Sequence, residues 1–252
     1  MGRPVTRTRG AVARTGLSAE WKRSLRATER RLRSTSSPRR AVAEKAYLKS
    51  PNTFLGNSVP ELRSAARQLV RDHPNPTREE LRAVVEELWA ERVHEHWTLG
   101  LLLLESYRGV LDRRDLPFVQ RLIRRGSWWN YVDLLAVHVA GPIVAREDPA
   151  GRTMERWSRD PNLWVRRGGL LALLPGLKAC VIEFRVFERA AVPRLPERDF
   201  FMRKALGWIL REVGKHDPVS VAEFLQRHSA DVSPLTRREA VRYLPAGSGP
   251  AP

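Results

Sequence analysis

Helix start signals recur along this chain from about residue 41, and they constrain its fold more than any other feature. Thr77 to Glu80 and Thr236 to Glu239 have the form of a capping box, in which two side chains satisfy backbone N–H groups at a helix N-terminus. Asp160-Pro161 combines an N-cap residue with a proline suited to the first helical turn, and Ser127 offers a further start. No Asn-Gly hairpin signal occurs. The chain is therefore predicted to be all-α.

Apolar residues with helical periodicity lie between these signals. The predicted helices cover residues 17–33, 41–49, 58–71, 77–90, 92–108, 115–124, 127–139, 161–173, 198–213, 217–228 and 234–244. The run 179–187 fits a strand or a helix by periodicity, and its helical neighbours favour a helix. Helices of this length in antiparallel succession form either a bundle or a right-handed, curved solenoid of HEAT-like pairs with a concave face. A spacing of roughly 35–40 residues between helix pairs favours the solenoid.

Positive charge is concentrated near the N-terminus. The chain has 45 Lys and Arg residues against 28 Asp and Glu, a formal net charge of +17. Residues 1–40 hold twelve of these cations and two Glu, a net charge of +10, which leaves +7 on the remainder. We therefore expect a basic, partly disordered extension over 1–40, a helical-repeat domain over 41–246 and a flexible tail over 247–252. A surplus shared by extension and domain indicates a polyanion partner.

Several classes of protein are excluded by what the sequence lacks. No run approaches the roughly 18 apolar residues of a membrane helix, and the N-terminus has no apolar segment of a secretory signal. Cys180 is the single cysteine, so neither an internal disulfide nor a cysteine-based zinc cluster can form. His94 and His96 are two residues apart on a predicted helix and face different sides. We expect a cytoplasmic protein without a metal or another cofactor.

The stretch Arg125 to Leu135 places two adjacent tryptophans and a lone acid after a run of arginines. In a helix, its apolar core stripe consists of Trp128, Val132, Leu135 and Val139. Trp129 and Asp133 form a second line, rotated by about 100° from that stripe, with the acid one turn after the indole. This line is either a half-buried boundary with an ordinary surface acid or part of a functional site.

The predicted helix 198–213 repeats this arrangement. Its core stripe consists of Met202, Leu206, Ile209 and Val213. Trp208 lies away from that stripe, towards Lys204 and Arg211 on the polar face. A tryptophan among cations is either covered by a neighbouring helix or stacks against a sugar or base.

Arg167 lies in a third segment of interest. It shares a helical stripe with Leu163, Leu170 and Leu174. An arginine at such a position commonly extends its stem over apolar surface. Alternatively, its guanidinium reaches into a cleft and holds a phosphate with two hydrogen bonds.

Together, these segments resemble the AlkD-type alkylpurine DNA glycosylases, an all-helical family built of HEAT-like repeats. The matching stretches occur in the family's order over roughly residues 41–245, and they are KAYLKS, TFLGNSVPELR, SWWNYVD, NLWVRRGGL, FFMRKALGWILRE and LTRREAVRYL. SWWNYVD and KALGWILRE are the most specific of them. The sequence departs from the family at Asn130, where relatives commonly have an acid, and at Gly168-Gly169, where alanines are usual.

The resemblance implies excision of purines alkylated at N3 or N7 from a DNA duplex held against the concave face. It implies that Asp133 is the catalytic aspartate and that Trp129 and Trp208 are the two tryptophans of the site. Arg167 matches a phosphate-side arginine of the family, and Tyr47 a tyrosine of its site. Further DNA-binding residues are expected to be Arg166, Lys204 and Arg211. It also implies that the lesion need not enter a deep pocket, unlike the substrates of base-flipping glycosylases.

Such lesions need fewer catalytic groups than an ordinary glycoside. Most glycosidases use one carboxyl group to protonate the leaving group and another to stabilise or attack the sugar. A purine alkylated at N3 or N7 is already cationic and leaves neutral, so only the oxocarbenium charge on the sugar needs an anion. Asp133, kept ionised by its positive surroundings, would oppose that charge and position water, while the indole faces pack on the deoxyribose. This mechanism requires a carboxylate that faces the groove and is not held in an internal ion pair.

Two other functions are compatible with the sequence. A helical-repeat protein without catalytic activity could bind branched or bent DNA, although it would not need a carboxylate facing phosphates. The arginine-rich extension alone favours an RNA- or ribosome-associated scaffold. An enzyme that acts as a monomer on duplex DNA accounts for the largest number of residues.

Overall fold

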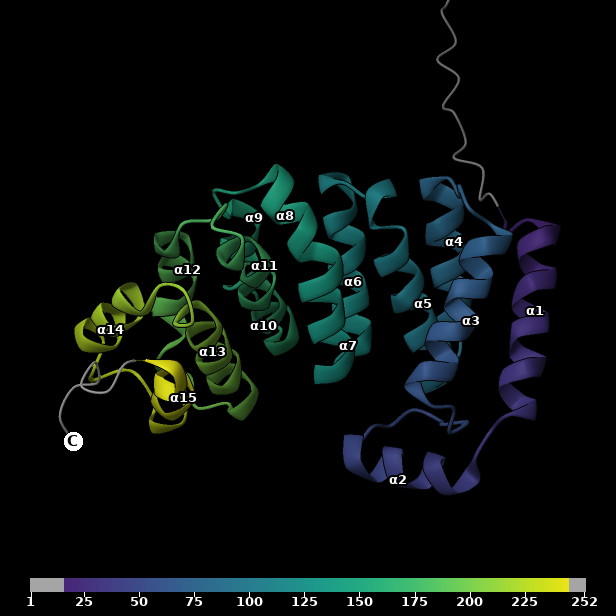
Figure 1. Cartoon of the computed structure of the whole chain (residues 1–252), viewed down its shortest axis with the longest axis horizontal. Coiled ribbons are helices and arrows are strands. Elements are labelled where there is room, and N and C mark those ends of the chain that lie inside the picture. The colour runs from purple at the N-terminus through teal and green to yellow at the C-terminus, as the bar shows by residue number, and fades with distance from the viewer. Residues whose placement is uncertain (1–15, 245–252) are drawn as a thin grey trace, which may run out of the picture.

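The computed structural model describes residues 16–244, and all of their regular secondary structure apart from one isolated β-bridge is helical (Figure 1). The α-helices are α1 (Ala19–Ser34), α2 (Pro38–Leu48), α3 (Val59–Asp72), α4 (Arg78–Leu88), α5 (His94–Ser106), α6 (Leu116–Gly126), α7 (Trp129–Leu134), α8 (Gly141–Glu147), α9 (Arg152–Trp157), α10 (Leu163–Leu171), α11 (Leu174–Lys178), α12 (Phe184–Ala191), α13 (Phe200–Val213), α14 (Pro218–Arg227) and α15 (Pro234–Ala240). The predicted all-α class is confirmed. Residues 1–15 of the expected basic extension and the expected tail over 247–252 lie outside the described residues.

The helices stand side by side in one row, except that α2 crosses the lower edge of the row in Figure 1. Contacts link α1, α3, α5, α7, α10, α13 and α15 in that order, and the intervening helices pack beside them. The predicted solenoid of stacked helices is therefore confirmed. Within residues 16–244, no helix is long and apolar enough to cross a membrane.

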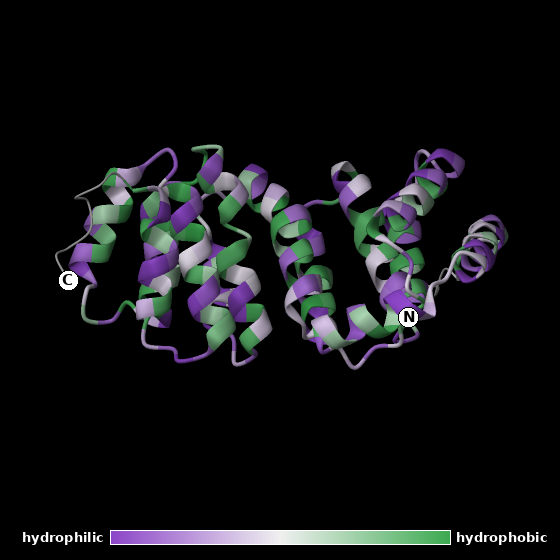
Figure 2. Cartoon of the chain, turned by 60° about the horizontal axis from the view of Figure 1, so that its bottom comes forward, coloured by the Kyte–Doolittle hydropathy of each residue, from purple (hydrophilic) through white to green (hydrophobic). Residues whose placement is uncertain are grey.

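A continuous hydrophobic core runs along the row. Figure 2 shows that individual helices carry both hydrophobic and hydrophilic residues, as expected for helices that bury one side. Trp89 and Trp97 stack in the first half of the core, with ring centroids 4.4 Å apart. In α13, the predicted core residues Met202, Leu206, Ile209 and Val213 are all buried. The helical period of the sequence therefore identified the inward side of this helix.

Some helix starts are where the sequence predicts them. Thr77 caps α4 in a complete capping box, since Glu80 Oε2 accepts the N–H of Thr77 at 2.8 Å. Ser58 and Glu61 form a second complete box at α3. Each box satisfies backbone donors that the helix itself leaves unpaired.

Three other predicted start signals are wrong. Asn162, not Asp160, caps α10, and its Oδ1 accepts two backbone N–H groups. Ser127 ends α6 in a left-handed conformation (φ 41°) instead of starting α7. Ser233 caps α15, so Thr236 lies inside that helix. At α10 and α15 a neighbouring polar side chain has taken the role, whereas α7 starts after Trp128 without a side-chain cap.

The helix that contains Asp133 does not stop near residue 139 as predicted. It passes through a π-helix, Leu135–Ala140, into α8. Pro142 lacks the N–H that would bond the carbonyl of residue 138, and the wider turn accommodates this, with the N–H of Gly141 donating to Ala136. The run 179–187 is helical only from Phe184 onward.

Part of the expected extension belongs to the helical row. Helix α1 packs against α3, and its Trp21 and Leu32 are almost completely buried. The indole of Trp21 stacks on His73 with centroids 3.7 Å apart. The expected boundary after residue 40 falls inside α2. Helix α1 therefore contributes to the core through Trp21 and Leu32.

A buried carboxylate ties the loop between α2 and α3 to α5. Glu95 is fully buried and accepts the backbone N–H groups of Leu55 at 2.9 Å and Gly56 at 2.7 Å. Gly56 has φ +85°, and a Cβ there would lie 2.1 Å from the carbonyl oxygen of Ser37. The loop is thus held close to the start of α2, which positions α2 along the edge of the row.

Glu95→Ala is expected to lower the free energy of unfolding by about 3 kcal/mol, because two or more buried backbone donors lose a charged acceptor. Urea denaturation followed by circular dichroism measures this. Glu87→Ala, at an exposed position on α4, serves as the control and should change stability by about 0.5 kcal/mol or less. A loss below about 1 kcal/mol for Glu95→Ala would show that the loop is held by other contacts.

Candidate active site

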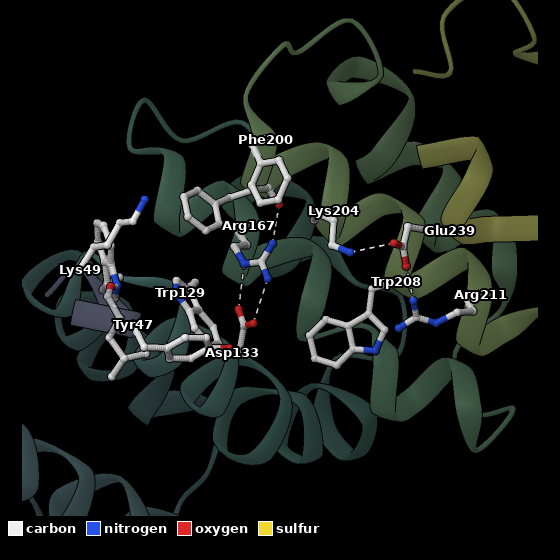
Figure 3. A pocket seen from close by; sticks show the side chains of 13 residues that line it. Tyr47, Lys49, Trp129, Asp133, Arg167, Phe200, Lys204, Trp208, Arg211 and Glu239 are labelled. Atoms are coloured by element: carbon white, nitrogen blue, oxygen red, sulfur yellow. Dashed lines mark hydrogen bonds and ion pairs between the residues drawn. The ribbon is translucent and has the colours of Figure 1, made fainter. Parts of the chain in front are cut away.

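A cavity of about 680 Å³ lies where α2, α7, α10, α13 and α15 meet (Figure 3). Seven of the eight predicted site residues line it, and they are Tyr47, Trp129, Asp133, Arg167, Lys204, Trp208 and Arg211. Six further residues complete the lining, and they are Leu48, Lys49, Trp128, Phe200, Phe201 and Glu239. The structure therefore brings together side chains that are up to 192 positions apart in the sequence.

Asp133 and Arg167 form a two-pronged ion pair in the wall of this cavity. Arg167 Nε donates to Asp133 Oδ1 and Nη2 to Oδ2, both at 2.8 Å (Figure 3). Arg167 Nη1 also donates to the carbonyl oxygen of Phe201. The arginine is 5% exposed and the Asp133 side chain 17% exposed. One guanidinium thus connects α7, α10 and α13.

This pair corrects two expectations from the sequence. Asp133 was expected to be free of an internal ion pair, and Arg167 was expected to direct its two parallel donors at a phosphate. Instead, the two side chains pair with each other across the contact between α7 and α10. The expectation that Asp133 faces the cavity holds, since the carboxylate is part of its lining.

Burial dominates the electrostatics of Asp133. Removal from water raises the pKa of Asp133, and the hydrogen bonds and charge of Arg167 oppose that rise without cancelling it. The sequence suggested that positive surroundings keep Asp133 ionised. In the structure the net effect is the opposite, because the pKa of Asp133 is raised. Arg167 is the group that favours the ionised form in a site that otherwise disfavours it.

Two glycines allow Arg167 to reach this position. A Cβ on Gly168 would lie 2.9 Å from Ile123 Cδ1, and one on Gly169 would lie 2.9 Å from the backbone nitrogen of Ser158. Helix α10 therefore approaches its neighbours more closely than an alanine would allow without movement. Glycine at these two positions thus suits the close packing of α10.

The mouth of the cavity is aromatic. Trp129 and Tyr47 meet edge to face with ring centroids 6.4 Å apart, and Tyr47 is 76% exposed on the last turn of α2. Trp128, expected to be a core residue, is half-buried and lines the cavity. Its indole N–H donates to the carbonyl oxygen of Leu48. Trp128 therefore fixes the end of α2 beside the site, a role that its position in a helical stripe could not reveal.

On the opposite side, Trp208 lies between two cations that share one carboxylate. Lys204 Nζ is 2.7 Å from Glu239 Oε1, and Arg211 donates to Glu239 Oε2 (Figure 3). Glu239 belongs to α15, and its pKa is lowered first by the hydrogen bond from Lys204. Gly207 makes this reach possible, since a Cβ there would lie 2.6 Å from Glu239 Cβ. The sequence had assigned Glu239 to a capping box and so missed its place in the site.

Arg166 is the predicted site residue that the structure leaves out of the cavity. Its Nε lies 3.0 Å from Glu197 Oε1, and its Nη1 donates to the carbonyl oxygens of Asp160 and Pro161, both at 2.9 Å. The Arg166 side chain thus holds the start of α10 in place.

Lys49 was not identified from the sequence. This residue directly follows α2 in a left-handed conformation (φ 48°) and lies at the mouth of the cavity.

A buried polar network holds the first turn of α7. Tyr131 is 1% exposed, and its hydroxyl accepts from Asn52 Nδ2 at 3.1 Å and lies 2.7 Å from His94 Nδ1. Burial lowers the pKa of His94, so its neutral ring can accept a hydrogen bond from the Tyr131 hydroxyl.

Within residues 16–244, no group of three or more His, Cys, Asp or Glu residues could hold a metal ion.

Comparison with known proteins decides the family. A model of the family described as "DNA alkylation repair enzyme" matches residues 28–244. The chain belongs to this family. The resemblance drawn from the sequence is thereby confirmed, and membership in the DNA alkylation repair family supports an enzyme with a role in DNA repair and a DNA substrate. Among curated protein sequences, no match to the chain is found.

Solved structures agree with this assignment to the DNA alkylation repair family. A predicted DNA alkylation repair enzyme from Enterococcus faecalis superposes with a TM-score of 0.76 at 25% identity, covering 84% of this chain and 98% of that one. The structure of smu.31 from Streptococcus mutans UA159 superposes with a TM-score of 0.59 at 15% identity, covering 90% and 100%. The second likeness supports the fold alone.

The pKa of Asp133 should lie above the ordinary aspartate value of about 3.9. In Arg167→Met it should rise further, because both effects that lower it come from Arg167. Titration of the Asp133 side-chain carbon by ¹³C NMR measures both values. The folded variant then binds this proton more tightly than the unfolded chain, so its stability should fall as pH rises from 4 to 7. An ordinary value in the wild type would contradict the assigned burial.

Proposed function

We propose that this protein is a monofunctional DNA glycosylase that hydrolyses the N-glycosidic bond of cationic N3- or N7-alkylated purines in duplex DNA. The observation that carries the proposal is the carboxylate of Asp133 in the wall of a cavity that also presents Trp129 and Trp208. Membership in the DNA alkylation repair family supports the substrate class. The proposed enzyme works as a monomer without a cofactor.

The chemistry requires an anion near the sugar and little else. As the alkylated base leaves with the bonding electrons, its positive charge is neutralised and positive charge develops on the deoxyribose. An ionised Asp133 opposes that charge and orients a water molecule for attack at C1′. Trp129 and Trp208 offer ring faces that pack on the sugar and favour a cation. The leaving base needs no proton from the enzyme.

The requirement drawn from the sequence, that Asp133 be free of an internal ion pair, is not met. We propose that this requirement was too strict. A carboxylate has about four lone-pair positions, and Arg167 occupies two of them. The remaining positions can accept from water or face the sugar. Because burial raises the pKa of Asp133, the arginine contributes by favouring the charged form and by fixing the orientation of the carboxylate. We therefore assign Arg167 a positioning role in place of a purely phosphate-binding one.

Glu239 supplies a second carboxylate to the cavity but does not act as a general acid. Its pKa is lowered, so it carries no proton to donate at neutral pH. Its ion pairs with Lys204 and Arg211 hold two cations beside Trp208. Lys49 lies across the cavity from them (Figure 3). We assign these cations and Tyr47 to the DNA backbone on either side of the lesion.

Asp133→Asn is expected to reduce the release of 7-methylguanine from methylated duplex by at least about 10²-fold. Affinity for undamaged duplex should stay the same or rise slightly, because a charge that repels phosphate is removed. Single-turnover assays and fluorescence anisotropy measure the two quantities. Asp160→Asn is the matched control, since Asp160 also pairs with an arginine, Arg124, but lies outside the cavity. Equal release by the wild type and Asp133→Asn would refute the mechanism. Binding without release by the wild type would instead favour a non-catalytic DNA-binding protein.

The charge of the lesion should matter more than its shape. A duplex that contains 7-methylguanine should react at least about 10²-fold faster than one with its neutral 7-deaza counterpart, because no general acid assists the departure of a neutral base. Uracil should also be a poor substrate. Chromatographic analysis of the freed bases tests this. Comparable rates for the charged and neutral bases would show that a proton donor is present.

A further inference from the structure

The solvent-facing side of α1 is strongly basic. The helix is held to the row by Trp21, Thr28 and Leu32, which are buried. The opposite side carries exposed cations, and they are Lys22, Arg23, Arg26, Arg30 and Arg31. Because their spacing follows the helical period, they lie along the length of the helix. Because α1 packs on the row, the positions of these cations relative to one another are fixed by the helix.

Neighbouring α3 extends this basic region. Its exposed Arg63 and Arg67 are four residues apart and share one side of that helix. A cavity of about 320 Å³ lies between the two helices, and Arg23 and Arg31 are part of its lining. We call these seven exposed cations of α1 and α3 the N-terminal basic surface. It lies at the end of the row, away from the cavity that contains Asp133 (Figure 1).

No ion pair holds the seven cations of this surface in the described part of the chain. Among the described residues, none of the seven has an Asp or Glu oxygen within 4.0 Å, whereas Arg166, Lys204 and Arg211 are each paired. Residues 16–73 hold thirteen Lys and Arg against five Asp and Glu, a net charge of +8. Residues 74–244 hold 28 against 23, a net charge of +5. Clustered unpaired cations repel one another, so a partner of opposite charge is favoured.

Three of the seven cations, Lys22, Arg23 and Arg26, precede the part of the chain that the family model matches. The family match begins at residue 28, after the first half of α1. The Enterococcus relative is covered over 98% of its length by 84% of this chain, so residues of this chain have no counterpart there. The family model thus leaves out the first half of α1 but includes the remaining four cations of the surface.

We propose that the N-terminal basic surface binds the phosphate backbone of duplex DNA outside the lesion site, without regard to sequence. The inference rests on the proposed function, since it takes the partner to be the enzyme's own substrate polymer. It adds a second contact region that provides affinity for undamaged DNA and takes no part in base release. None of its seven cations is held in an ion pair, so each is available to replace counterions on the duplex.

The test uses the full chain with Arg23, Arg26 and Arg30 replaced together by Gln. These side chains are exposed, so the thermal unfolding midpoint should be unchanged. Affinity for an undamaged duplex is measured by anisotropy at several salt concentrations. The slope of log affinity against log salt should become shallower by about 2–3, since each lost phosphate contact removes about 0.9. Single-turnover release of 7-methylguanine at saturating enzyme should be unchanged.

A matched control separates a local surface from overall charge. Arg152, Arg156 and Arg159 are three exposed arginines on or just after α9, and their replacement by Gln removes the same charge. This control should leave the salt slope nearly unchanged. Equal effects of the two triple variants, or no effect of the α1 variant, would overturn the proposal.

Two further measurements separate failure of this proposal from failure of the proposed glycosylase. Single-stranded RNA is measured beside the duplex, and a larger loss of affinity for RNA than for duplex in the α1 variant would overturn the choice of partner. Base release by the wild type is measured in parallel. If no base is released but the α1 variant alone shows a shallower slope, the proposed glycosylase fails while the surface stands.

Discussion

The ion pair between Asp133 and Arg167 is the interaction on which the rest of the site depends. A buried guanidinium needs a well-oriented anion, because removing either partner leaves an uncompensated charge in the interior. Here the same guanidinium also bonds the backbone of α13 at Phe201, so three helices meet at one group. Since those helices carry Trp129, Arg167 and Trp208, the distances between the candidate catalytic groups are set by this junction.

The close packing of the helices around this ion pair depends on glycines as well as on the side chains that form the site. Gly168 and Gly169 bring α10 against α6 and α9, and Gly207 brings α15 against α13. Each approach delivers a charged group, Arg167 in the first case and Glu239 in the second. On the other side, Trp128 holds the end of α2 through a hydrogen bond to its last carbonyl group. The cavity is thus a product of helix spacing, not of a specialised loop.

Much of this arrangement could be predicted from the sequence, and the limits have physical causes. Helical periodicity located the α13 core and set Trp208 apart from it. The family's motifs drew attention to Asp133 and Trp129, and both line the cavity. Pairing across helices is a tertiary property, so the choice of Arg167 between apolar surface, phosphate and carboxylate stayed open. Glu239 was taken for a cap because short motifs record local chemistry only. Nor does a proline at position 142 reveal whether a helix will end or widen.

The cavity draws its walls from Tyr47 near one end of the described chain and from Glu239 near the other. Contacts between such distant positions form late, because a long stretch of chain must first be ordered between them. A chain still emerging from the ribosome can stack its early helices but lacks α15, and with it the carboxylate that steadies Lys204 and Arg211. The site therefore needs α15 in place, because a polypeptide that lacked this helix would carry Lys204 and Arg211 without their shared carboxylate.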